Sequence, residues 1–372
     1  MGATCEWLTA AADGSRPDLA AVSKALGPHA PTQINPWSSV DPLPRGGRVT
    51  IDSGGQLGIA SAPRSGAQEL CDDLVSDHRK LLELLSSEGI KLLDQAADAA
   101  RPPQRCLDDP RYRAMEYRFD QIGPFGALTM CSTAATQISV DAGGDTESVQ
   151  RRWHLLHAIG PAMIAAFSCS SQLYDAPVGA WVSQRMRTWL EVDTPRTCGT
   201  AHSRDYGRWA VEVPLLCAQR DGSDDWRAPY GMSFGDWIEL GEKSFAGRAP
   251  TEADLDLHLM TLFPPVRPTG RLEVRYIDAQ PGDLWRVPLA AYAALLSGPG
   301  AMAEAMGAAR STAGRWSDAA EFGLADLELR SAATALLSLA AAYSEEPEFV
   351  RLLDTAAERC CRGLAPGSED HV

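Results

Sequence analysis

A carboxylate and two guanidinium groups lie close together in the segment 258–281, HLMTLFPPVRPTGRLEVRYIDAQP. Glu273 and Arg275 stand two residues apart in an alternating run, so both side chains fall on one face of a predicted strand. Arg267 precedes them on a segment stiffened by prolines. Carboxylate oxygens bind hard cations, and a planar guanidinium binds phosphate or carboxylate through paired hydrogen bonds. The alternative interpretation is a surface salt bridge on an exposed sheet face.

The elements that must position these groups follow from the hydrophobic patterning. Strands are predicted over 1–8, 48–52, 56–61, 129–140, 208–216 and 272–278, and helices over 18–26, 67–93, 149–168 and 329–343. Strands and helices interleave without a regular βαβ order. This order favours an α+β fold with an antiparallel sheet over a doubly wound parallel sheet. We expect one domain over 1–372, in which 300–361 form a C-terminal helical part.

Composition excludes several classes of protein. The chain has 372 residues, a formal net charge of −15 and 45% hydrophobic residues, which is typical of a globular protein without affinity for nucleic acid or acidic membranes. The nine cysteines are odd in number and form no Cys-x-x-Cys pair, so neither a disulfide framework nor a zinc ribbon is indicated. No signal peptide is visible, and the most apolar stretch, 332–343, is too short to cross a bilayer. These features predict a cytoplasmic protein.

Phosphate-binding glycine motifs are also absent from the sequence. Neither the P-loop pattern nor the dinucleotide-binding Gly-x-Gly-x-x-Gly pattern occurs. If the protein uses ATP, it must therefore hold the phosphates with metal ions and arginines on a sheet.

Several blocks of the chain resemble glutamate–cysteine ligases of the ergothioneine-pathway type. The long segment 258–281 is similar to a block of that family in both residues and spacing. Further blocks occur in the family's order: RYRAMEYRF at 111–119, MCSTAATQISVDAG at 130–143, GAWVSQRMRTWLEVD at 179–193 and MSFGDW at 232–237. Together these blocks cover most of the chain up to about Pro288.

The resemblance implies a glutamine-synthetase-like catalytic fold, in which a curved antiparallel sheet carries helices on its outer face. It implies an ATP- and Mg²⁺-dependent ligase that joins the γ-carboxyl of glutamate to the amine of cysteine through a γ-glutamyl phosphate. The implied roles are metal binding by Glu6, Asp52 and Glu273; catalysis by Arg275 and Arg267; and substrate or ATP binding by Gln137, Asp141, Arg185 and Arg111. For Gln137, Asp141 and Arg185, an ordinary structural role is an equal alternative.

Two expected carboxylates are missing. The family's first strand carries two glutamates, whereas this chain has Thr4 before Glu6, and Gly58 stands where the family's hairpin has another glutamate. Fewer oxygen ligands weaken Mg²⁺ binding. Two alternatives therefore stay open beside the glutamate–cysteine ligase: a divergent ligase with another amine acceptor, and a catalytically weakened homologue that binds glutamate or nucleotide. Relatives also carry a helical segment before the first strand.

Overall fold

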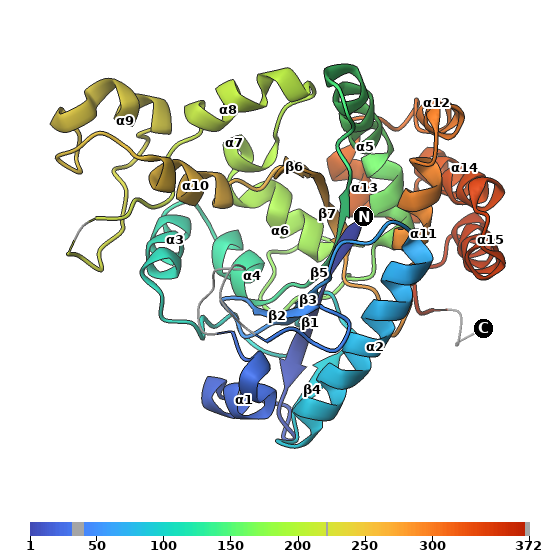
Figure 1. Ribbon diagram of the computed structural model, residues 1–372, viewed down its shortest axis with the longest axis horizontal. Coiled ribbons are helices and arrows are strands. Elements are labelled where there is room, and N and C mark those ends of the chain that lie inside the picture. The colour runs from blue at the N-terminus through green and yellow to red at the C-terminus, as the bar shows by residue number, and fades with distance from the viewer. Residues whose placement is uncertain (32–40, 221, 369–372) are drawn as a thin grey trace.

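The architecture is a sheet with helices on both faces. The computed structural model describes residues 1–31, 41–220 and 222–368, and within these residues seven strands form one antiparallel sheet (Figure 1). The strands are β1 (Gly2–Ala10), β2 (Arg48–Ile51), β3 (Leu57–Ala60), β4 (Lys91–Leu93), β5 (Ala135–Val140), β6 (Val266–Pro268) and β7 (Leu272–Asp278). Their spatial order is β2-β3-β1-β5-β7-β6, and β4 pairs with the C-terminal end of β1. The α+β class with an antiparallel sheet is thereby confirmed.

Alternation along the strands gives the sheet one apolar and one polar face. In β1, Cys5 and Trp7 are buried in the main hydrophobic core, while Glu6 projects to the opposite face. In β7, Val274 enters the same core and its neighbour Arg275 points the other way. The polar face is therefore the one on which chemistry can take place.

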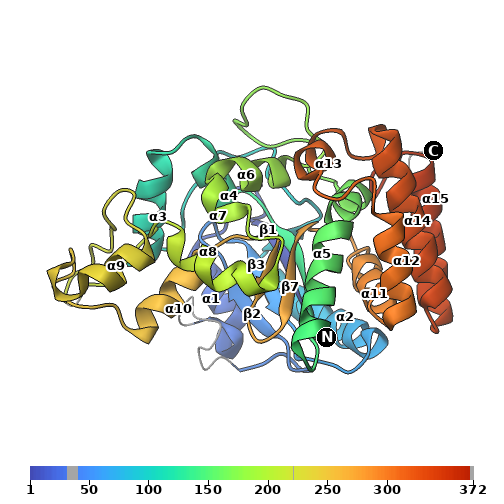
Figure 2. The same ribbon diagram turned by 90° about the horizontal axis from the view of Figure 1, so that it is seen from above.

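The apolar face is covered by two layers of helices. The covering helices are α2 (Ala67–Ser86), α5 (Thr146–Phe167) and α11 (Arg286–Leu295), with α12 (Pro299–Ala308), α13 (Trp316–Phe322), α14 (Leu327–Tyr343) and α15 (Pro347–Cys361) packed against α5 and α11 (Figure 2). The predicted stripe of α14 is fully buried at Leu329, Ala333, Leu336 and Leu337. A short helix, α1 (Leu19–Leu26), is capped by Asp18 and lies against α2.

The polar face is bordered by shorter helices. These are α3 (Pro110–Asp120), α4 (Phe125–Cys131), α6 (Gln184–Val192), α7 (Thr194–Thr197), α8 (Tyr206–Glu212), α9 (Phe234–Leu240) and α10 (Glu252–Met260). Helices α9 and α10 extend to the left of the sheet in Figure 1, away from the helical layers. Within the described ranges, no helix is long and apolar enough to cross a membrane.

Three predicted elements are wrong in part or in whole. Residues 208–212 of the predicted strand 208–216 belong to the helix α8, which ends at Glu212 because Pro214 forces the preceding residue Val213 into an extended conformation. The predicted strand 129–140 begins only at Ala135, because 125–131 form the helix α4. The predicted helix 67–93 ends at Ser86; Leu92 matched its apolar period by coincidence and belongs to β4.

The alternative interpretation, in which Glu273 and Arg275 lie on an exposed face of the sheet, is also wrong. All seven residues of β7, including Glu273, are buried. A strand between two neighbours, with helices over both faces, leaves its polar residues little contact with solvent. The charged residues of β7 therefore interact with protein groups or ligands rather than with bulk water.

Candidate active site

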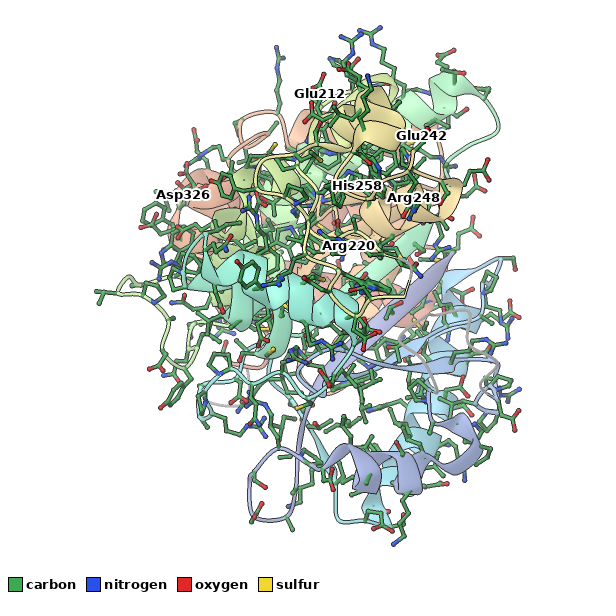
Figure 3. All side chains as sticks on the ribbon, turned by 90° about the vertical axis from the view of Figure 1, so that its left-hand side faces the viewer. Glu212, Arg220, Glu242, Arg248, His258 and Asp326 are labelled. Carbon is green, nitrogen blue, oxygen red and sulfur yellow. The ribbon has the colours of Figure 1, made fainter. Side chains whose placement is uncertain are left out.

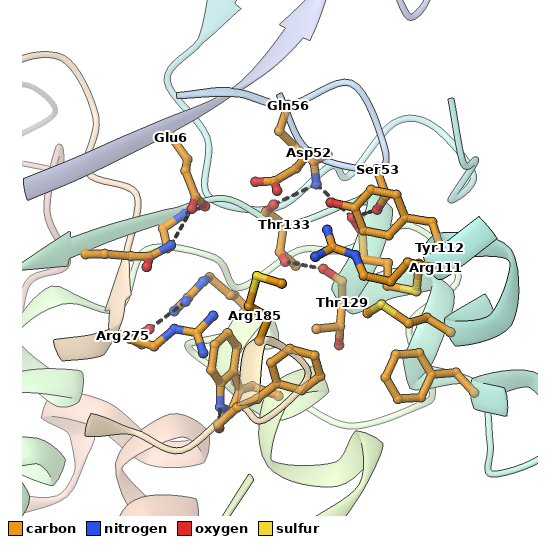
Figure 4. Close-up of a pocket in the computed structure, with 18 residues that line it drawn as sticks. Glu6, Asp52, Ser53, Gln56, Arg111, Tyr112, Thr129, Thr133, Arg185 and Arg275 are labelled. Carbon is orange, nitrogen blue, oxygen red and sulfur yellow. Dashed lines mark hydrogen bonds between the residues drawn. The ribbon is translucent and has the colours of Figure 1, made fainter. Parts of the chain in front are cut away.

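A pocket of about 200 Å³ lies on the polar face of the sheet (Figure 4). Its charged lining residues are Glu6, Asp52, Arg111, Arg185 and Arg275, and the side-chain amides of Gln56 and Gln137 line it as well. These residues come from strands β1, β5 and β7, the turn after β2, and helices α3 and α6. Six of the nine predicted site residues therefore meet in one cavity, although more than 260 positions separate the first from the last in the sequence.

Glu6 forms part of the floor of the pocket. Its carboxylate accepts hydrogen bonds from the side-chain amide of Gln137 and from the backbone N–H of Ala135, the latter at 2.8 Å. Burial, with the nearby negative charge of Asp52, raises the pKa of Glu6 to about 7. A buried carboxylate that is costly to ionise is suited to a positively charged ligand.

Asp52 reaches the pocket from the hairpin turn between β2 and β3. The turn closes through a hydrogen bond of 2.9 Å from the N–H of Gly55, whose φ of +83° suits glycine, to the carbonyl of Asp52. Gly54 packs so tightly that a side chain there would lie 2.3 Å from the carbonyl oxygen of Cys131, at the end of α4. Gln56 fixes the same turn by donating to the carbonyls of Met130 and Thr133. Burial raises the pKa of Asp52, and the charges of Arg111 and Arg275 oppose that rise.

Arg275 and Arg185 form a cationic end of the pocket. The Arg275 guanidinium lies over the ring of Trp189, 4.7 Å from its centroid, and burial lowers the pKa of Arg275 to about 9. Its Nε atom is buried and has no hydrogen-bond partner among the described residues. Arg185 donates from Nη2 to the backbone carbonyl of Arg275 at 2.7 Å. A buried guanidinium with an unsatisfied donor is suited to an anionic ligand.

Arg111 enters the pocket from α3, whose first turn is capped by Asp109. Its guanidinium lies over the ring of Tyr112, 4.7 Å from the centroid. The helical spacing brings Met115 and Phe119 to the same side, so α3 contributes both a cation and apolar surface.

Glu273 and Arg267 lie beside the pocket and do not line it. They are paired across β6 and β7, and Arg267 binds the Glu273 carboxylate with its Nε at 3.1 Å and its Nη2 at 2.8 Å. Arg275 Nε lies 3.9 Å from the same carboxylate. Burial has the largest single effect on the pKa of Glu273 and raises it, but the charges of Arg267 and Arg275 and the hydrogen bonds from Arg267 together outweigh burial, so the net pKa is lowered.

Asp141 does not join the other predicted residues. The shared face with Gln137 ends with β5 at Val140, and Asp141 is an exposed residue just beyond the strand. Its carboxylate accepts from the N–H of Gly143 at 2.8 Å, and it borders a separate surface depression near Arg152. Alternation within a strand cannot be extended past the strand's end.

Sequence reasoning missed most of the apolar wall of the pocket. Trp189, in the block 179–193, is expected from the sequence to shape the pocket wall and does line it. The rest of the wall was not predicted and consists of Met115, Phe119, Met130, Met260 and Phe263. Met260 and Phe263 lie within the recognised segment 258–281, but no spacing marks them as pocket residues, because their orientation depends on the turn after α10. Gln56 and Ser53 were also missed; their side chains secure the turn that carries Asp52.

His258 has a structural role. It is fully buried, its Nε2 lies 2.7 Å from the carbonyl of Ala210, and its ring stacks on Phe234. Figure 3 shows it together with Arg248 in the part of the molecule formed by α9 and α10. Arg248 binds both oxygens of Asp254 there, at 2.6 and 2.9 Å.

The three residues that the resemblance implies as metal ligands do not form one cluster in the structure. Across the described part of the chain, no group of three or more His, Cys, Asp or Glu side chains is placed to hold a metal ion. Glu6 and Asp52 share the pocket, whereas Glu273 is bound by Arg267. Mg²⁺ commonly binds through one or two carboxylates together with water and substrate phosphates, so this pair fits a cation that arrives with a nucleotide.

Comparisons with known proteins show the family of the chain. A sequence profile of glutamate-cysteine ligase family 2 (GCS2) matches residues 18–363. The chain is 34% identical to glutamate–cysteine ligase EgtA of Mycobacterium tuberculosis over 347 residues, which are 91% of this chain and 79% of that protein. It is 35% identical to EgtA of Mycolicibacterium smegmatis over 327 residues, 85% and 76% of the two chains. The chloroplastic glutamate–cysteine ligase of Brassica juncea is 26% identical over 250 residues, 64% of this chain and 47% of that protein. On the profile match and the two mycobacterial relatives, the chain belongs to glutamate–cysteine ligase family 2.

Proposed function

We propose that this protein is an ATP-dependent glutamate–cysteine ligase that forms γ-glutamylcysteine for ergothioneine biosynthesis. The relatives' names support this activity, and one observation in the structure carries it: a single pocket holds two carboxylates, Glu6 and Asp52, beside a buried Arg275 with an unsatisfied donor. A cation site beside an anion site is what a reaction between a carboxylate and a polyphosphate requires.

The chemistry is an exchange at the γ-carboxyl of glutamate. A γ-carboxylate oxygen attacks the γ-phosphorus of ATP, the bond to the β-phosphate oxygen breaks, and ADP leaves. The amine of cysteine then attacks the acyl phosphate carbon, inorganic phosphate departs, and the amine loses a proton. Both partners in the first step are anions, so the positive charge of Arg275 lowers the repulsion between them and stabilises the transferring phosphoryl group. Arg185, beside it, binds a carboxylate of glutamate.

Mg²⁺ would be held by Glu6 and Asp52 together with the nucleotide. When bound, it neutralises phosphate charge. The protein's own contribution is to keep both carboxylates fixed, through the hydrogen bonds to Glu6 and through the closed turn that carries Asp52. Glu273 contributes indirectly, because it balances the charges of Arg267 and Arg275.

The apolar wall gives the acceptor a defined environment. Met115, Phe119 and Phe263 provide soft, polarisable contacts that suit the thiol of cysteine.

We also propose that the sheet with its covering helices is the glutamine-synthetase-like catalytic fold. Residues 1–372 then form one catalytic domain, and residues 300–361 are its C-terminal helical part.

A weakened homologue is the second candidate, and the absence of a carboxylate at Gly58 favours it. An ADP-release assay with Mg²⁺, glutamate and a panel of amines separates the candidates. Turnover that depends on cysteine supports the ligase. Turnover with another amine alone indicates a divergent ligase. No turnover with any amine, while ATP or glutamate still raises the melting temperature, indicates a binding protein.

A further inference from the structure

A further buried carboxylate, which does not line the pocket, lies beside Arg185 at the cationic end. Asp278, the last residue of β7, is 2% exposed and does not line the cavity. Its carboxylate accepts hydrogen bonds from the hydroxyl of Ser170 at 2.7 Å, the hydroxyl of Ser183 at 2.9 Å and the N–H of Cys169 at 3.1 Å. Three donors converging on one buried carboxylate hold it in a single orientation.

These hydrogen bonds join Asp278 to the start of α6. Ser183 is the N-cap of that helix, and its hydroxyl also accepts from the N–H of Met186 at 3.0 Å. Ser170 accepts in turn from the N–H of Arg185 at 3.2 Å. The negative charge thus lies at the positive end of the α6 dipole and fixes the turn that carries Arg185.

Arg185 lies between two carboxylates. Its Nη1 is 3.7 Å from Asp278, and the charge of Glu6 acts on it from within the pocket. Burial lowers the pKa of Arg185, and these two carboxylates oppose that effect, Asp278 more strongly. Because Asp278 already partners one edge of the guanidinium and Nη2 is bound to the carbonyl of Arg275, the group's orientation is defined before substrate arrives.

We propose that Asp278 is a positioning residue that aligns Arg185 for the carboxylate of glutamate. The inference rests on the proposed function, since it concerns how that substrate is bound. A purely structural role, in which Asp278 only caps α6, is the alternative. The two roles predict different results when Asp278 is replaced. If Asp278 aligns Arg185, the effect of the replacement requires Arg185 to be present. If Asp278 only caps α6, the effect of the replacement does not depend on the side chain at position 185.

Kinetics of Asp278→Asn, Arg185→Lys and the double variant test the proposal. Asp278→Asn should raise KM for glutamate about tenfold and change KM for ATP and kcat less than threefold. On the Arg185→Lys background, the same substitution should change KM for glutamate less than threefold, because the aligned group is already lost. An unchanged KM in the single variant, or effects that multiply in the double variant, would overturn the proposal.

A matched control and a second readout complete the test. Asp326, labelled in Figure 3, also caps a helix and pairs with an arginine, Arg315 at 2.6 Å. It is not among the residues that line the pocket. Asp326→Asn should lower the melting temperature without raising KM for glutamate. A crystal structure of the unsubstituted protein should show the hydrogen bond from Arg185 to the carbonyl of Arg275. A crystal structure of Asp278→Asn should show that this hydrogen bond is lost. Retention of that bond in the variant contradicts the proposal even if the unsubstituted protein shows no ligase activity, so the two failures are distinguishable.

Discussion

Arg267 binds both carboxylate oxygens of Glu273, with Nη2 at 2.8 Å from Oε2 and 3.2 Å from Oε1. The strand that carries the anion site is thus stabilised by an ion pair immediately beside the pocket. Arg275, two residues along β7, shares the same carboxylate at 3.9 Å. One carboxylate consequently balances two guanidinium groups, of which only Arg275 lines the cavity.

Glu273→Gln should therefore affect both stability and activity. The substitution leaves Arg267 without its counter-charge, which costs about 1–3 kcal/mol in the free energy of unfolding. It also increases repulsion between Arg267 and Arg275, and turnover should fall at least tenfold. Urea denaturation and ADP release measure the two effects. The double variant with Arg267→Gln should recover stability but not turnover; full activity in Glu273→Gln would refute any role for this residue in the site.

The raised pKa of Glu6 should be measurable in the pH dependence of the unfolding free energy. Its pKa is about 7 in the folded protein and 4.5 without the surrounding structure, so the folded state binds the proton more tightly. The unfolding free energy should consequently fall as the pH rises from 4.5 to 7, and Glu6→Gln should remove that decline. Mg²⁺ should raise the melting temperature more at pH 8 than at pH 5.5, because it binds the ionised carboxylate. A Mg²⁺ effect equal at both pH values, or unchanged in Glu6→Gln, would exclude Glu6 as a ligand.

Gly58 cannot accept a side chain without a change in its neighbour. It lies opposite Glu6 in one strand pair and opposite Thr50 in the other, and an added Cβ would be 2.5 Å from the Thr50 hydroxyl. Gly58→Ala should destabilise the protein by about 1–3 kcal/mol. Thr50→Ala removes the clashing oxygen, so the double variant should regain most of the loss in urea denaturation. Additive losses would show that Thr50 is not the obstacle.

Arg275→Lys tests the anion site. Lysine keeps the charge but loses the planar fork and the stacking on Trp189. We expect kcat to fall about 100-fold while the melting temperature changes by only a few degrees. Arg271→Lys serves as the control, because Arg271 immediately precedes β7 and donates to the hydroxyl of Ser139 outside the pocket. Equal losses in both variants would contradict a specific role for Arg275.

Elements with strong periodicity could be predicted from the sequence. The alternation of β7, the apolar stripe of α14 and the glycine turn before Gln56 all appear as expected, apart from shifts at their ends. Alternation failed at 208–216, where Trp209 and Val211 alternate like strand residues yet lie in α8. A helix this short has too few turns for its period to be distinguished from that of a strand.

Only part of the candidate site could be predicted from the sequence. Residue type and spacing on β7 indicated Arg275, and family blocks indicated Glu6, Asp52 and Arg185. No local pattern indicates that Arg267 would bind Glu273, because that pair depends on the hairpin between β6 and β7. The apolar wall and Asp278 depend in the same way on contacts between segments far apart in sequence, which periodicity does not contain.

Isotope transfer from glutamate tests the central claim most directly. Glutamate labelled with ¹⁸O in its γ-carboxylate is incubated with the protein, ATP, Mg²⁺ and cysteine, and the released inorganic phosphate is examined by mass spectrometry. If the pocket brings the γ-carboxylate and ATP together as proposed, each turnover transfers one ¹⁸O atom to phosphate, and γ-glutamylcysteine forms in equal amount. Phosphate released without ¹⁸O, or without γ-glutamylcysteine, would contradict the account.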